Sequence, residues 1–108
     1  MPDIEQDERL DLWDTDEDDK FALRVAGNAM IGEHIQDGDF VVIRKAKSAK
    51  SGDIIAIRDD EGEATLRRYF PLPKGGVRLE LSPAEGKTSI IRDKVEILGV
   101  LVGVVRKY

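Results

Sequence analysis

Few residues in this 108-residue chain could carry out catalysis, since it has a single histidine, His34, and no cysteine. One histidine leaves a Ser-His-Asp arrangement possible by count, but a zinc site built from several His and Cys ligands is excluded. His34 follows Glu33 just after a glycine, and we interpret it as a turn residue partly in water. The sequence therefore predicts no metal site and no cofactor.

An acidic stretch at residues 59–63, Asp-Asp-Glu-Gly-Glu, looks at first like a cation loop. It lacks the alternating ligand spacing and the terminal bidentate Glu of a calcium loop. It predicts a polar hairpin turn in which Gly62 supplies a positive φ. The glycines at positions 27, 32, 38 and 52 form no phosphate-binding fingerprint, because none is followed by a helix in a βαβ unit.

The charge of the chain is concentrated in its first 20 residues. They hold ten acidic residues against Arg9 and Lys20, whereas the other 88 residues hold 12 acidic and 15 basic ones. We expect this leader to be extended or disordered, with Leu10, Leu12 and Trp13 able to anchor it on the domain. An alternative is a short partner-binding motif around Trp13. The negative charge of the leader would repel nucleic-acid phosphates.

The elements that must position any site are strands. Period-two alternation and short β-branched runs, separated by Gly, Pro, Asp and Ser, predict strands at residues 21–25, 40–43, 54–57, 63–69, 77–81 and 95–105. No amphipathic helix is evident. Residues 37–44 and 51–58 share one template, a Gly turn followed by a buried strand and an Arg, and we expect them to be adjacent antiparallel strands. Residues 21–108 should form one all-β domain with a compact, strongly bent antiparallel fold.

No segment is apolar enough for a membrane. The longest apolar run, residues 97–105, contains two glycines and is far shorter than the roughly 20 residues of a spanning helix. No basic and then apolar leader opens the chain. The sequence predicts a cytoplasmic protein without a membrane partner.

Four motifs, taken in order and spacing, resemble one family. They are Val-Ala-Gly-Asn-Ala-Met-Ile at 25–31, Ile-Gln-Asp-Gly-Asp-Phe-Val-Val at 35–42, Gly-Asp-Ile-Ile-Ala at 52–56 and Ala-Thr-Leu-Arg-Arg-Tyr at 64–69. The chain resembles the C-terminal domain of LexA-type SOS repressors, self-cleaving serine peptidases whose family includes UmuD-like proteins and phage repressors. The resemblance runs from about Phe21 to Tyr108, over four fifths of the chain.

Both catalytic positions of that family are changed. The resemblance implies a serine nucleophile where Ala29 stands, a lysine base where Arg67 stands, and the backbone of Asn28 at the oxyanion position. Ala29 has no nucleophilic atom, and a guanidinium, which titrates above about 12, cannot act as the base. Asn28 and Thr65 are poor substitutes, since Asn is not a usual nucleophile and Thr65 has no base beside it. We expect no self-cleavage. Introduced substitutions and natural loss of the protease both remain open.

The substrate and partners implied by the family are also altered. The family cleaves an Ala-Gly bond on an upstream loop when a RecA filament stabilises the cleavable form, but the one Ala-Gly pair here, Ala26-Gly27, lies in the nucleophile turn. The chain has no helix-turn-helix, so we expect no DNA binding by this chain alone. The resemblance implies a homodimer through the last strand, at Gly99, Val100, Leu101, Val102, Gly103, Val104 and Val105. We expect this apolar strand to be an edge strand that needs a partner.

The leading interpretation is the dimerisation and regulatory domain of a LexA-like transcriptional repressor, inactive as a peptidase. Two alternatives stay open: a non-catalytic module that binds an extended peptide by strand addition, and an active peptidase of the related signal-peptidase-like superfamily. A further hypothesis places residues 11–19 near Arg67, with Trp13 on the cleft wall and a carboxylate on the guanidinium. Its alternative is a disordered leader with Arg67 reaching water.

Overall fold

The computed structural model describes residues 4–6 and 19–106 and contains one antiparallel sheet. Its strands are β1 (Ile4–Gln6), β2 (Lys20–Val25), β3 (Phe40–Lys45), β4 (Ile54–Arg58), β5 (Ala64–Pro71), β6 (Val77–Leu81), β7 (Thr88–Arg92) and β8 (Glu96–Val105). One short 3-10 helix, η1 (Ile31–Glu33), lies between β2 and β3. The all-β prediction is confirmed, and all six expected strands are present.

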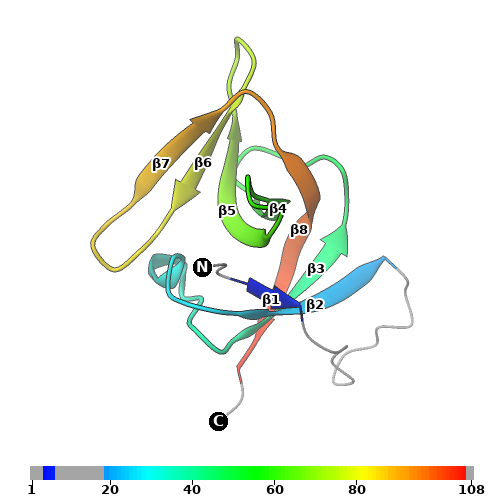
Figure 1. Cartoon of the computed structure of the whole chain (residues 1–108), viewed down its shortest axis with the longest axis vertical. Helices are drawn as coiled ribbons and strands as arrows, with labels where there is room; N and C mark the ends of the chain where they lie inside the picture. Colours follow the sequence, from blue (N-terminus) through cyan, green and yellow to red (C-terminus); the bar gives the residue numbers. More distant parts are fainter. Residues whose placement is uncertain (1–3, 7–18, 107–108) are drawn as a thin grey trace.

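The strand order is β1-β2-β3-β8-β4-β5-β6-β7, so the last strand of the chain lies inside the sheet. It runs between β3 and β4 in Figure 1, from orange to red. Two expectations were therefore wrong. The template strands at 37–44 and 51–58 are not neighbours, because β8 separates them, and β8 is not an edge strand over its whole length. The apolar strand β8 therefore lies where a neighbouring strand can pair with it on each side.

The sheet bends enough to bring β1 close to β5, and the described residues form three buried clusters, of which the two larger ones bear on the site. Side chains alternate between the faces of a strand. Leu66 accordingly packs with Met30 in one cluster, whereas Ile55 and Ile57 of β4 pack with Leu79 in the other. Arg67 and Thr65 pair across the strands with Ile55 and Ile57, and so share the face of the second cluster.

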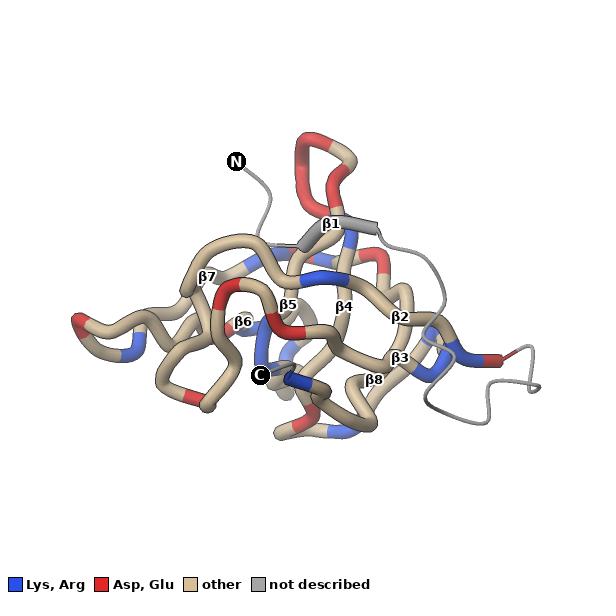
Figure 2. Tube along the Cα trace, turned by 90° about the horizontal axis from the view of Figure 1, so that it is seen from below, with Lys and Arg blue, Asp and Glu red and all other residues tan. Residues whose placement is uncertain are grey.

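The acidic stretch at 59–63 forms the hairpin turn between β4 and β5 and projects from the sheet (Figure 2). Gly62 has φ +81° as expected. One carboxylate oxygen of Asp59, Oδ1, accepts the backbone N–H groups of Glu61 and Glu63, both at 2.9 Å. Turn geometry therefore accounts for Asp59 without a bound cation.

Part of the acidic leader belongs to the sheet, since β1 pairs with β2 from Ile4↔Val25 to Gln6↔Leu23. Leu10, Leu12 and Trp13 lie outside the described residues. The hypothesis that residues 11–19 lie near Arg67 also falls outside them, except for Asp19. The carbonyl oxygen of Asp19 accepts the Lys45 N–H, and the carboxylate of Asp19 lies 3.6 Å from the Lys20 Nζ.

The described residues include no helix of the length and apolarity that crossing a bilayer requires.

Candidate functional site

The turn after β2, which carries the nucleophile position, is braced by Asn28 and Asp37. The Gly27 N–H donates to Asp37 Oδ1 at 2.7 Å, and the Asp37 N–H donates to Asn28 Oδ1 at 3.0 Å. Gly27 has φ +90°, which disfavours any residue with a Cβ. The Asn28 side chain thus holds the turn in shape, a role that sequence reasoning missed.

Asp39, the second acid of the Asp-Gly-Asp motif, is almost fully buried. Its side chain accepts Nε and Nη2 of Arg106 at 2.8 and 2.9 Å and the Gln36 N–H at 2.8 Å. Arg106 also donates to the His34 carbonyl oxygen, which fixes the end of β8 to the turn. The hydrogen bond from Arg106 lowers the pKa of Asp39 despite its burial. The pair spans 67 residues, so no local pattern indicated it.

Ala29 sits half-buried where the turn meets the end of β6. Its carbonyl oxygen accepts the Ser82 N–H at 2.9 Å, and the Gly32 N–H donates to the Ser82 carbonyl oxygen at 2.7 Å. A Cβ at position 32 would lie only 3.0 Å from the Ser82 Cβ, so a glycine permits this close contact. Ser82 directly follows β6, and β6 pairs with β5 from Arg68↔Glu80. The nucleophile position is therefore hydrogen-bonded to the end of β6, the strand next to the one that carries Arg67.

Glu33 connects the same turn to β5. Its carboxylate forms an ion pair with Arg68, accepts the Ser82 hydroxyl at 3.3 Å and lies 4.0 Å from the Lys87 Nζ. Burial alone would raise the pKa of Glu33, but Arg68 and Lys87 outweigh burial and the pKa is lowered. Sequence reasoning missed this pair, since Arg68 has no local feature to distinguish it from the neighbouring Arg67.

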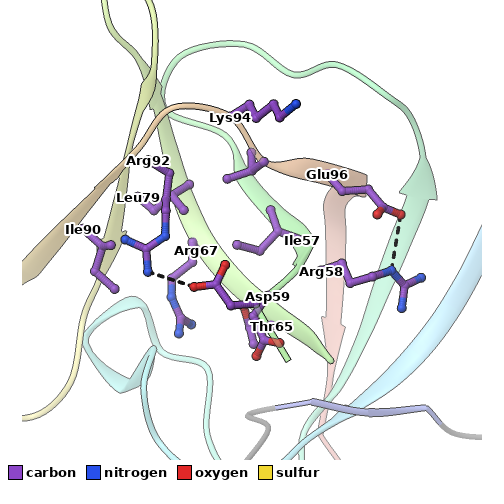
Figure 3. Close-up of a pocket in the computed structure, with 12 residues that line it drawn as sticks. Ile57, Arg58, Asp59, Thr65, Arg67, Leu79, Ile90, Arg92, Lys94 and Glu96 are labelled. Carbon is purple, nitrogen blue, oxygen red and sulfur yellow. Dashed lines mark hydrogen bonds and ion pairs between the residues drawn. The ribbon is translucent and has the colours of Figure 1, made fainter. Parts of the chain in front are cut away.

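Arg67 lies in the middle of β5, half-buried, and its Nη1 donates to the Leu66 carbonyl oxygen at 2.5 Å. It lines a cavity of about 440 Å³ that Thr65 also lines, which confirms that the two side chains share a face. The cavity is built from β4, β5, β6, β7 and the residues that lead into β8 (Figure 3). Where the resemblance places a lysine amine, this chain thus has a guanidinium at the wall of a cavity.

Residues of the expected dimer interface have different environments. Gly99 and Val100 are buried inside the sheet, whereas Val102 and Val104 are 49% and 39% exposed. β8 pairs with β4 only up to Val100, so 101–105 have β3 on one side and no strand on the other among the described residues. That half of β8 has an open edge.

The described part of the chain contains no group of three or more His, Cys, Asp or Glu side chains that could hold a metal ion. The candidate site consists of a braced turn, a charged strand and a cavity that Arg67 lines and Ala29 does not. An all-β fold with this turn and this strand, at the positions where the resemblance implies a serine and a lysine, defines the class of LexA-like C-terminal domains.

The comparisons with known proteins agree with this class. The family model of Peptidase S24-like proteins matches residues 3–102. The chain belongs to this family, and within it to the LexA type of C-terminal domain.

Three LexA repressors illustrate the similarity. That of Pseudothermotoga lettingae is 45% identical over 93 residues, covering 83% of this chain and 45% of the relative. That of Thermotoga neapolitana is 48% identical over 91 residues, covering 82% and 42%. That of Lactobacillus delbrueckii subsp. bulgaricus is 39% identical over 93 residues, covering 85% and 44%. The chain spans less than half the length of these curated relatives.

Proposed function

We propose that the chain is the dimerisation and regulatory domain of a LexA-like transcriptional repressor, and that its peptidase site is silent. Family membership supports the repressor role. The observation that carries the proposal is the edge of β8 at 101–105, where exposed valines lie beside strand backbone that no other described strand pairs on its outer side. Exposed apolar edges of this kind lead to pairing with another chain unless they are protected.

The silence of the site follows from the chemistry of two side chains. Acyl transfer in this family requires a hydroxyl and a neutral amine that takes its proton. Ala29 supplies no hydroxyl. The guanidinium of Arg67 donates hydrogen bonds but has no lone pair with which to take a proton from a hydroxyl. The turn and the strand are retained, so the domain keeps the architecture of the site without its reaction.

The directions of the side chains and backbone groups along β8 support the proposed dimer. Val102 and Val104 point to the exposed face, and the backbone of 101–105 offers its outer N–H and C=O groups to a partner strand. A second copy related by a two-fold axis would supply the same groups in antiparallel order, which makes the interface self-complementary. The valines of the two copies would then cover one another.

Sedimentation equilibrium at micromolar concentration tests the dimer. We expect twice the chain mass of 12.1 kDa. Val102→Asp should give the monomer, because a carboxylate would face its own copy across the interface. Ile91→Asp is the matched control, since Ile91 is an exposed residue of β7, at 57% exposure, far from this edge in the strand order. A monomeric parent chain, or equal dissociation of both variants, would refute the proposed interface.

The repressor role also implies two partners that the family resemblance predicts. A RecA filament would be the regulator, and an attached DNA-binding domain would supply operator recognition, which we do not expect of this chain alone. These partners, together with the SOS role and the cytoplasmic location, stay predictions.

A further inference from the structure

Three groups of the turn that carries position 29 converge on Ser82, the residue after β6. The Ala29 carbonyl oxygen accepts the Ser82 N–H at 2.9 Å, and the Gly32 N–H donates to the Ser82 carbonyl oxygen. The Glu33 carboxylate accepts the Ser82 hydroxyl at 3.3 Å. Ser82 is 1% exposed, so solvent reaches its amide only when the turn moves away. The Ser82 amide therefore reports whether the turn is docked on the sheet.

Apolar packing buries this turn but gives its position little direction. Met30 and Ile35 are buried in the cluster that contains Leu66 of β5. Hydrophobic contact is non-directional, and a methionine side chain adapts to the space around it. Such packing would tolerate a shift of the turn along β5. A directional contact is needed to set where along β5 the turn lies.

The Glu33 carboxylate supplies a directional contact with β5. The Glu33 side chain is 15% exposed and forms an ion pair with Arg68, the residue next to Arg67. Arg68 also donates to the Gly52 carbonyl oxygen, so the turn before β4 helps to hold its guanidinium. A guanidinium offers its N–H groups in a fixed planar geometry. The pair therefore sets the turn at the level of residue 68 on β5.

A largely buried ion pair contributes more to position than to stability. The cost of removing two charges from water offsets most of their attraction, and in some proteins such pairs specify one arrangement of packed elements. Lys87 lies 4.0 Å from the same carboxylate, but its side chain is 63% exposed. Exposed pairs of that kind contribute little. Arg68 is therefore the partner through which Glu33 acts on the position of the turn.

We propose that Glu33 is a positioning residue for the turn that carries position 29. Through Arg68 it fixes the turn at one point along β5, and through Ser82 it fixes the turn against the end of β6. The inference goes beyond the proposed function, because it assigns the side chain that keeps the retained turn in its arrangement. It does not depend on the dimer, since none of these three residues lies on β8.

Amide hydrogen exchange of the full chain, followed by NMR, tests this role. The reporters are the Ser82 and Gly32 N–H groups, which link the turn to the end of β6. Glu33→Gln keeps the size of the side chain and removes its charge. We expect both reporters to exchange at least ~10-fold faster in this variant, because the turn loses a charge-assisted bond. The amides of the β3–β8 ladder, which report opening of the whole sheet, should change less than about twofold.

Glu80→Gln is the matched control. The Glu80 side chain is 13% exposed, and its partners are Arg78 at 3.2 Å and Lys87 at 3.9 Å, neither of which lies in the turn. We expect this variant to leave both reporters unchanged. Unchanged reporters in Glu33→Gln, or equal acceleration in Glu80→Gln, would overturn the proposal. Equal acceleration of the reporters and the β3–β8 ladder would also overturn it, because it would show a loss of stability only.

A serine introduced at position 29 gives a second readout. In the chain with Ala29→Ser and Arg67→Lys, we expect Glu33→Gln to slow labelling by a serine-directed phosphonate at least ~10-fold. Glu33→Asp, which keeps the carboxylate, should recover part of the rate, and Glu80→Gln should not change it. Equal labelling with and without Glu33→Gln would contradict the positioning role. Amide exchange needs no reaction, so it decides the proposal if the introduced serine is unreactive.

Discussion

Whether the braced turn can react depends on the side chains at positions 29 and 67. The backbone of the turn is held by Asn28 and Asp37 on one side and by Ser82 on the other, and none of these contacts uses the side chain of Ala29. A hydroxyl at position 29 would therefore be presented by an intact turn. What that hydroxyl lacks is a base, because Arg67 cannot accept its proton.

Ala29→Ser alone should not restore reactivity, whereas Ala29→Ser combined with Arg67→Lys should rebuild a reactive serine. A positioned general base contributes about 10²–10⁴-fold to such a step. We expect the double variant to react with a serine-directed phosphonate at alkaline pH at least ~100-fold faster than the single variant. Mass spectrometry of the labelled chain measures both rates. Equal labelling of the two variants would show that Arg67 does not occupy the position of the base.

Arg106→Ala should destabilise the fold in a pH-dependent way. It leaves Asp39 buried without its guanidinium, a loss of about 1–3 kcal/mol in the free energy of unfolding at pH 7. Because Arg106 lowers the pKa of Asp39 in the folded state, the stabilisation is present above the ordinary aspartate pKa and is lost as pH falls through the folded value. Urea unfolding of both chains between pH 7 and pH 2.5 should show the difference shrinking below about pH 4. A difference that does not change with pH would contradict this role of the pair.

The residues that brace the site were only partly predictable. The motifs around positions 27 and 37 indicated a turn, because Gly and Asp have local preferences for such backbone. The partners of Asp39 and Glu33 were not predictable, since Arg106 and Arg68 lie 67 and 35 residues away along the chain. Such contacts depend on strand order, which local pattern does not determine.

At the scale of the elements, the placement of β8 depends on Gly99. A Cβ at this position would overlap the Arg44 carbonyl oxygen and the Ile43 side chain of β3. Gly99 thus permits a close approach between β8 and β3 of the same chain. Gly103, on the same strand, has open space around the position of a Cβ.

Gly99→Ala should therefore be destabilising and Gly103→Ala should not. We expect a loss of about 1–3 kcal/mol for Gly99→Ala, because the strand must shift away from β3, and a change within about 0.5 kcal/mol for Gly103→Ala. Urea unfolding measures both, in the Val102→Asp background so that self-association does not contribute. Equal effects of the two substitutions would show that β8 does not need this close approach.

Strand positions were predicted better than strand order. Residues 77–81 were predicted with both bounds, because Val-Arg-Leu-Glu-Leu alternates between apolar and charged residues. The strand β7 was missed, since Thr-Ser-Ile-Ile-Arg shows no alternation and has four of its five residues exposed at the edge of the sheet. β1 was missed because its three residues lie within a stretch whose acidic composition favours disorder. The insertion of β8 between β3 and β4 is a long-range pairing that local periodicity does not reveal.

At the scale of the whole molecule, the described residues form two distinct surfaces. One is the cavity between the β4–β5 hairpin and β7, which charged and apolar side chains line together. The other is the outer edge of β8 over 101–105, which has exposed valines. The proposed role of this chain depends on the second surface, through which two copies would pair.

Hydrogen exchange along β8 measures that pairing directly. We predict that the outward-pointing amides of residues 101–105 are protected at high protein concentration and lose protection on dilution or in Val102→Asp. The inward-pointing amides, which bond to β3, should remain protected throughout. Outward amides that exchange at the same rapid rate at every concentration would contradict the β8 dimer and the function proposed from it.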